Sequence, residues 1–138
     1  FAPNPGEPFK PLKSIASSGE MARVMLALKT VLASQDSIPI LIFDEVDANV
    51  GGETAAVVGQ KMKQIGEKRQ ELCITHLAPV AAAGAAHYLV EKEVADGRTV
   101  TRVLPLEEKG KIAELTRMLG GSGEAARQHA EELLGKSP

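Results

Sequence analysis

Two short apolar runs, each followed closely by polar residues, constrain the fold of this chain more than any other feature. Residues 40–43 are Ile-Leu-Ile-Phe and run directly into Asp44 and Glu45. Residues 72–74 are Leu-Cys-Ile, and His76 follows two positions later. Continuous apolar runs rich in β-branched and aromatic residues are typical of strands that are covered on both faces. We therefore expect two buried β-strands here.

The segment between the two runs predicts how these strands are paired. Residues 53–67 carry apolar side chains at helical spacing, so the order is strand, helix, strand. Such a βαβ unit joins parallel strands, which place their carboxyl ends at the same edge of the sheet. We expect Asp44, Glu45 and His76 to lie together at that edge, where open α/β sheets bind ligands.

The remaining segments predict further helices and one hairpin. Asp96-Gly97 is a strong turn signal between two alternating runs. Four prolines within residues 1–13 remove backbone donors and predict an extended lead-in. The other expected elements are helices at about 18–34, 78–84, 107–119 and 123–134 and strands at 87–94 and 98–104. The expected fold class is α/β, with a mainly parallel sheet flanked by helices and a hairpin toward the C-terminus.

Charge and cysteine content exclude several classes of protein. The 138 residues include 16 basic and 18 acidic side chains, so there is no overall basic footprint for nucleic acid. The single cysteine, Cys73, excludes an internal disulfide framework, and its strand position predicts an inert apolar role. No apolar run approaches the roughly 18 residues of a membrane span. A start at Phe1 without a signal peptide predicts a piece of a longer, cytoplasmic protein.

The expected cluster at the sheet edge has the chemistry of phosphoryl hydrolysis. A carboxylate directly after a buried strand, such as Asp44, is a good ligand for Mg²⁺, directly or through water. A second carboxylate beside it, Glu45, is able to orient or deprotonate a water. An imidazole at His76 is able to donate a hydrogen bond to a developing phosphate charge. The alternative interpretation is a solvated or capping acidic pair and a structural histidine.

The residues Ser17-Ser18-Gly19-Glu20 open the first expected helix with two possible roles. A serine with a glutamate three residues later is the pattern of a capping box. A helix N-terminus with serine hydroxyls is also a natural site for an anion. The sequence leaves both interpretations open.

Several segments together resemble a known family. Residues 14–29, SIASSGEMARVMLALK, look like a signature motif with its helix, and residues 40–47, ILIFDEVD, look like a Walker B strand with a D-loop. Residues 73–81, CITHLAPVA, look like a switch-histidine segment, and 117–121 with 129–134 resemble the C-terminal end. In this order they resemble the heads of SMC-like ATP-binding cassette ATPases, and most closely the RecN family of bacterial recombinational DNA-repair proteins.

The resemblance implies a fold and an activity. Residues 1–138 would form the C-terminal half of a P-loop ATPase head of the ABC and SMC type. The parent protein would hydrolyse ATP with Mg²⁺ in a head-to-head dimer and act in double-strand-break repair and recombination at the bacterial nucleoid. Asp44 would hold the metal through water, Glu45 would be the general base, and His76 would contact the γ-phosphate.

The resemblance also implies a site completed between two heads. Ser17, Ser18, Gly19 and Glu20 would meet the γ-phosphate of ATP held by the opposite head, and Asp47 would be the D-loop carboxylate at that interface. Ser18 is a departure, because the family has Gly at this position. In the D-loop, Ala48 and Asn49 replace the usual Thr-Gly.

The phosphate-binding loop of such a head is absent from this sequence. No G-x-x-x-x-G-K-[ST] motif occurs. We therefore expect no ATP hydrolysis by the chain alone. The expected partners are the N-terminal half of the same head, a second head and, through the full-length protein, DNA, with no membrane. Two alternatives remain open: a Mg²⁺-dependent phosphohydrolase or nuclease that uses Asp44, Glu45 and Asp47, and a non-catalytic α/β interaction module.

Overall fold

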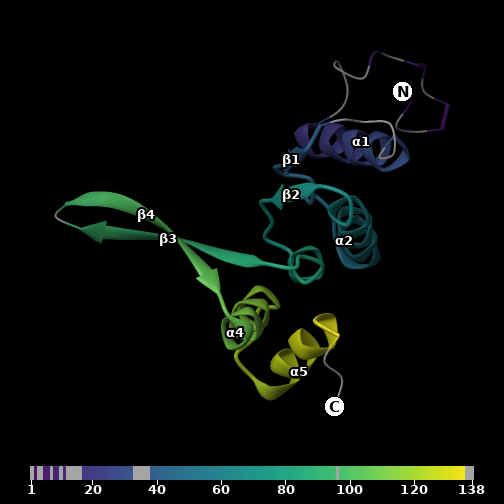
Figure 1. Cartoon of the computed structure of the whole chain (residues 1–138). Coiled ribbons are helices and arrows are strands. Elements are labelled where there is room, and N and C mark those ends of the chain that lie inside the picture. The colour runs from purple at the N-terminus through teal and green to yellow at the C-terminus, as the bar shows by residue number, and fades with distance from the viewer. Residues whose placement is uncertain are drawn as a thin grey trace. The chain divides into compact units, whose positions relative to one another are not determined.

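The chain forms two compact units, Phe1–Thr75 and His76–Pro138 (Figure 1). The computed structural model describes residues 2, 5–6, 8–9, 11, 17–32, 38–95 and 97–135. Most of the predicted lead-in at 1–13 and the last residues of the predicted helix at 18–34 lie outside the described residues.

The first unit contains the predicted βαβ arrangement. Its elements are helix α1 (Ser18–Val31), strand β1 (Ile40–Phe43), helix α2 (Gly52–Gly66) and strand β2 (Gln70–Cys73). The strands pair in parallel, with Ile40 opposite Gln70 and Phe43 opposite Cys73. The predicted strand order and direction are therefore confirmed, and the residues that follow β1 and β2 leave the sheet at the same edge.

The two faces of this sheet differ in burial. Leu41 and Phe43 are 9% and 5% exposed. They share the core of the unit with one residue of α1, one of the loop after β1 and the apolar side of α2: Leu26, Val46, Ala55, Val58, Met62 and Ile65. The opposite face carries Ile42, which is 68% exposed, and Leu72, which is 45% exposed. The prediction that both faces are covered is thus wrong within the described chain, because successive side chains point to opposite faces and only one face is packed.

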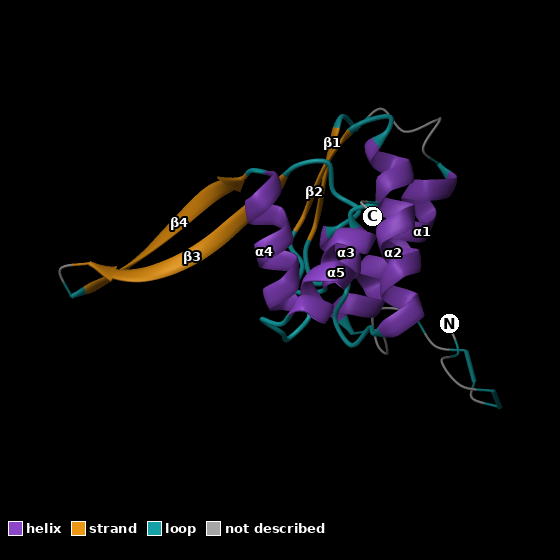
Figure 2. Cartoon of the chain, turned by 90° about the horizontal axis from the view of Figure 1, so that it is seen from below, coloured by secondary structure: helices purple, strands orange, loops and turns teal. Residues whose placement is uncertain are grey.

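The second unit combines a hairpin with three helices. Its elements are α3 (Ala78–Ala81), β3 (His87–Ala95), β4 (Arg98–Leu106), α4 (Glu108–Met118) and α5 (Glu124–Leu133). The strands β3 and β4 run antiparallel, from His87 opposite Leu106 to Ala95 opposite Arg98 (Figure 2). Gly97 adopts a φ of 72° at the turn, as the Asp-Gly signal predicts. The core of this unit is formed by Ala78, Leu115 and Ala130.

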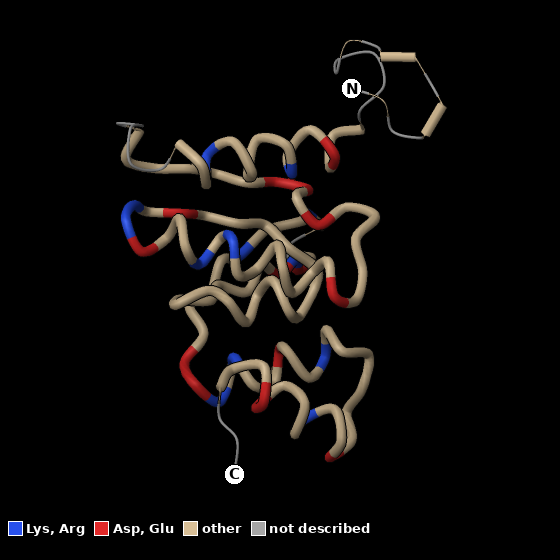
Figure 3. Tube along the Cα trace, turned by 90° about the vertical axis from the view of Figure 1, so that its right-hand side faces the viewer, with Lys and Arg blue, Asp and Glu red and all other residues tan. Residues whose placement is uncertain are grey.

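Charges are mixed along the described part of the chain and are not separated by sign. Figure 3 shows acidic and basic positions interspersed along the trace. Among the described residues, no helix combines the length and the apolar character that a membrane crossing requires.

Candidate functional site

The loop after β1 presents two acidic side chains and buries a third. Asp44 and Glu45 are exposed, whereas Val46 and Asp47 are 0% and 1% exposed. Glu45 adopts a φ of 59° and Asn49 a φ of 57°, in the left-handed region that side chains with a Cβ rarely enter. That conformation costs an L-residue about 1–2 kcal/mol, so the surrounding structure must hold the loop in place. The loop therefore directs the Asp44–Glu45 pair outward at the end of β1.

Asp47 is held inside the unit by a residue of the other strand end. Its carboxylate accepts a short hydrogen bond from the hydroxyl of Thr75. Thr75 follows the end of β2, and the amide of Ile74 donates to the carbonyl of Phe43 at 3.0 Å. The two strand ends are thus joined by side-chain and backbone hydrogen bonds. Within this chain, Asp47 is therefore a buried hydrogen-bond acceptor for Thr75. Its predicted position at a dimer interface stays a prediction.

His76 directly follows Thr75 in the chain. Its side chain is exposed, and it is the first residue of the second unit. The parallel pairing of β1 and β2 is the part of the predicted cluster that the structure confirms. The approach of His76 to Asp44 and Glu45 stays a prediction.

The N-terminus of α1 is closed by the predicted capping box. The backbone amide of Ser17 donates to Glu20 Oε2 at 2.8 Å, and the amide of Glu20 donates to Ser17 Oγ at 3.3 Å. Hydrogen bonds from Ser17 lower the pKa of the Glu20 carboxyl. The capping interpretation is therefore confirmed, while Ser17 and Ser18 remain exposed at the helix end. Exposure at a helix N-terminus keeps the second interpretation, an anion site, chemically open.

The first turns of α1 pack directly on the acidic loop. Gly19 is buried, and a Cβ at this position would lie 2.8 Å from Ala48 Cβ and 3.1 Å from the carbonyl oxygen of Glu45. One turn later, Arg23 Nη1 donates to the carbonyl of Ala48 at 2.8 Å and to that of Val46 at 3.4 Å. The capped helix start and the acidic pair therefore belong to one packed structure. Sequence reasoning missed Arg23, because its helical spacing carries no sign of a loop partner.

Asp44 is suited to bind a metal ion whose other ligands are mostly waters and substrate phosphates. No group of three or more His, Cys, Asp or Glu side chains able to hold a metal occurs among the described residues. Mg²⁺ is usually bound by one or two carboxylates together with waters and substrate phosphates. An exposed carboxylate at a strand end is suited to be the single protein ligand of such an ion.

Two ionisable side chains of β2 have raised pKa values. Burial raises the pKa of the Glu71 carboxyl to about 7, and both of its oxygens are buried without a hydrogen-bond partner. Burial, together with the nearby carboxylates of Asp47, Glu71 and Asp44, raises the pKa of the Cys73 thiol to about 12. A raised pKa disfavours the thiolate at neutral pH, in agreement with the inert role predicted for Cys73.

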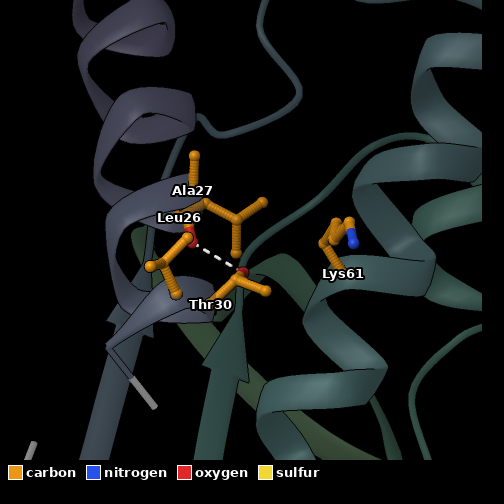
Figure 4. Close-up of a pocket in the computed structure, with 5 residues that line it drawn as sticks. Leu26, Ala27, Thr30 and Lys61 are labelled. Carbon is orange, nitrogen blue, oxygen red and sulfur yellow. Dashed lines mark hydrogen bonds between the residues drawn. The ribbon is translucent and has the colours of Figure 1, made fainter. Parts of the chain in front are cut away.

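A groove between α1 and α2 is lined mainly by apolar side chains. It is lined by Leu26, Ala27, Thr30, Val31 and Lys61 (Figure 4). The hydroxyl of Thr30 donates to the carbonyl of Leu26 at 2.8 Å, and the amine of Lys61 donates to Gln64 Oε1 at 3.2 Å. Among the described residues, the lining holds one hydroxyl and one amine and no carboxylate that could bind a metal or accept a proton, so the acidic loop remains the candidate site.

Comparison with known proteins gives a consistent set of relatives. The DNA repair protein RecN of Deinococcus radiodurans is 48% identical over 135 residues, which are 97% of this chain and 24% of that protein. RecN of Bacillus subtilis is 46% identical over 133 residues, which cover 95% of this chain and 23% of that protein. Over nearly all of its length, the chain is similar to RecN proteins.

This chain spans about a quarter of the length of the RecN proteins that it matches. No family model matches the chain. A solved chain from work on ATP-driven dimerization and DNA-stimulated activation of SMC ATPases has a TM-score of 0.55 at 22% identity, covering 86% of this chain and 70% of that chain. At this identity the likeness concerns the fold. The chain shares the α/β fold of that solved chain over the covered residues, and the predicted fold class is confirmed.

The close packing of Gly19 predicts that any larger residue at this position lowers the stability of the chain. We expect Gly19→Ala to lower the free energy of unfolding by about 1–2 kcal/mol, because overpacking outweighs the better helix propensity of alanine. Urea unfolding of the 138-residue chain measures this change.

A double-mutant cycle isolates the contact responsible. Adding Ala48→Gly removes the Cβ that lies nearest to the new methyl group, so it should restore part of the loss. Gly66→Ala in α2 is the control, because a Cβ there meets nothing within 4 Å. An equal cost at Gly66, or no rescue by Ala48→Gly, would contradict the steric explanation.

Proposed function

We propose that this chain is the C-terminal half of an ATPase head that hydrolyses ATP in a head-to-head dimer. The observation that carries the proposal is the exposed Asp44–Glu45 pair, held at the end of a parallel strand and packed against a capped helix N-terminus. Relatives at 46–48% identity are named DNA repair proteins, and this supports a role in bacterial double-strand-break repair and recombination. The protein would act in the cytoplasm, at the nucleoid.

The residues of the acidic loop have distinct roles in this proposal. Asp44 holds Mg²⁺ through water, and the ion supplies charge stabilisation at the phosphates when bound. Glu45 orients the attacking water and accepts its proton. His76 donates a hydrogen bond to the γ-phosphate. Because the proton acceptor and the metal ligand are consecutive residues after one strand, β1 places both with a single rigid element.

The start of α1 is the proposed contact with the nucleotide of a second head. Ser17, Ser18, Gly19 and Glu20 lie at the positive end of the helix dipole, which favours a phosphate. The Ser17 hydroxyl donates from Oγ to Glu20 Oε2 at 3.0 Å, and in the proposed contact it would donate to a phosphate oxygen instead. Asp47 belongs to the same proposed interface, and its bond to Thr75 keeps the loop backbone in place beside it.

The uncovered face of the β1–β2 sheet supports a partner that completes the head. Ile40, Ile42, Leu72 and Ile74 are 48%, 68%, 45% and 61% exposed, and the register places them on the same face. Two strands alone make a marginal sheet, and contiguous exposed apolar side chains mark interaction surfaces. The N-terminal half of the head, which would carry the phosphate-binding loop, is the proposed partner. DNA is engaged through other parts of the full-length protein.

ATP turnover by the chain alone and by the complete protein tests this proposal. We expect the complete protein to release phosphate from ATP with Mg²⁺, and the 138-residue chain to release none, because it has no phosphate-binding loop. Phosphate release, measured with both proteins at equal concentration, tests both expectations.

Two other outcomes would point to other functions. Cleavage of a simple phosphate ester or of DNA by the chain alone would indicate a self-sufficient phosphohydrolase or nuclease. A complete protein without ATP turnover would indicate a non-catalytic module.

A further inference from the structure

Arg23 makes a contact within the first unit that the proposed roles do not use. It lies on α1, one turn after the capped start of the helix, and its side chain is only partly exposed. Its guanidinium donates from Nη1 to two backbone carbonyls of the acidic loop, at 2.8 Å to Ala48 and at 3.4 Å to Val46. Such a bridge ties the helix to backbone atoms 23 and 25 residues further along the chain.

The two carbonyls belong to the residues one and three positions after Glu45, which has an unusual backbone conformation. Glu45 adopts a φ of 59°, and the turn that follows is closed by the amide of Ala48, which donates to the carbonyl of Glu45 at 3.0 Å. A non-glycine residue stays in the left-handed region only where its surroundings over-determine the conformation. Gly19 packs closely beside the turn, and Arg23 donates to two carbonyls of the same loop.

We infer that Arg23 is a positioning residue for Glu45, acting through the backbone of residues 46–48. This inference rests on the proposed function, because it concerns the same hydrolytic site. A charged donor bridging two carbonyls fixes their direction more firmly than neutral hydrogen bonds do. With the loop backbone fixed, the Glu45 carboxylate keeps the direction needed to receive a proton. A small displacement of a catalytic group is enough to cost about a hundredfold in rate.

Substitutions at Arg23 in the complete protein test the inference. Arg23→Met keeps the length of the side chain but removes the donors, and we expect kcat for ATP to fall about 10- to 100-fold while KM changes less than about threefold. Arg23→Lys retains one charged donor and should recover part of kcat. Lys63→Met, at an exposed position of α2, is the matched control and should leave kcat unchanged.

A second readout tests the positioning without relying on turnover. The amides of Ala48 and Val50 donate to the carbonyls of Glu45 and Asp47 at 3.0 and 3.2 Å. We expect Arg23→Met to speed hydrogen exchange of these amides about tenfold or more, with the melting temperature within a few degrees of the parent protein.

The possible results separate this inference from the proposed function. Unchanged exchange in Arg23→Met overturns the inference, whatever the activity. Parallel losses of kcat, KM and melting temperature that Arg23→Lys does not recover also overturn it, because they indicate a general structural role. Faster exchange in a protein in which Glu45→Gln leaves turnover intact supports the loop contact and refutes the role of Glu45 as a base.

Discussion

Glu45→Gln in the complete protein is expected to lower kcat for ATP by about 10²- to 10⁴-fold while nucleotide binding is retained. A positioned general base contributes about this much to a proton-transfer step. The amide of Gln has nearly the same shape as the carboxylate, but it does not accept a proton from water. Asp44 is left in place as the proposed metal ligand, so ATP and Mg²⁺ should still bind. Phosphate release and equilibrium binding of a fluorescent ATP analogue measure the two properties separately.

The same variant tests the proposed dimer. With hydrolysis blocked, nucleotide-bound heads should accumulate as dimers, which sedimentation in the presence of ATP would detect. Glu67→Gln is the control, because it removes an exposed carboxylate at the C-terminal end of α2, away from the acidic loop in the sequence. Turnover of Glu45→Gln at the rate of the control would show that Glu45 is not the base. A variant that stays monomeric with ATP would contradict the proposal that each nucleotide is bound between two heads.

Glu71 is expected to make the chain less stable as the pH rises. Its pKa is about 7 in the folded chain, against an ordinary value of 4.5, because burial disfavours the charged form. The folded state therefore holds a proton that the unfolded state releases between these two values. The contribution of Glu71 to the free energy of unfolding is fully present below about pH 4.5 and is lost as the pH rises through 7. Allowing for solvent screening of a partly exposed group, the loss is about 2 kcal/mol.

Urea unfolding of the 138-residue chain from pH 4.5 to pH 8 measures this loss. Glu71→Gln removes the titration and should flatten the stability profile over that range. Glu67→Gln, at an exposed carboxylate, should leave the profile as steep as in the parent chain. A parent profile that is flat, or that is equally steep in Glu71→Gln, would show that the Glu71 carboxyl is solvated or paired.

Local sequence patterns predicted most elements of the fold correctly. The capping box at Ser17 and Glu20 and the turn at Gly97 are both present. The parallel pairing of β1 with β2 followed from the order of strand, helix and strand. These features depend on residues close together in the chain or on the direction of consecutive elements. The exposure of Ile42 was not predictable in this way, because a strand pattern does not say which face the rest of the unit covers.

The candidate site was predicted only in part. The sequence placed Asp44 and Glu45 at the end of an apolar strand, and the structure confirms this. It did not distinguish Glu45, which is exposed, from Asp47, which is 1% exposed. Both are acidic residues of one loop, and the buried one accepts a hydrogen bond from the hydroxyl of Thr75, 28 residues away. Glu71 precedes the apolar run 72–74, and nothing in the sequence indicated that its carboxyl would be buried.

The sequence by itself determined where helices begin, where the hairpin turns, and that an acidic pair stands at the end of β1. These properties follow from hydrogen bonds and apolar contacts among residues a few positions apart. Only the tertiary structure decided that Glu45 takes a left-handed backbone, that Asp47 turns inward, and that Arg23 binds the loop. Each of these depends on atoms more than twenty residues apart, which the folded backbone brings within hydrogen-bond distance.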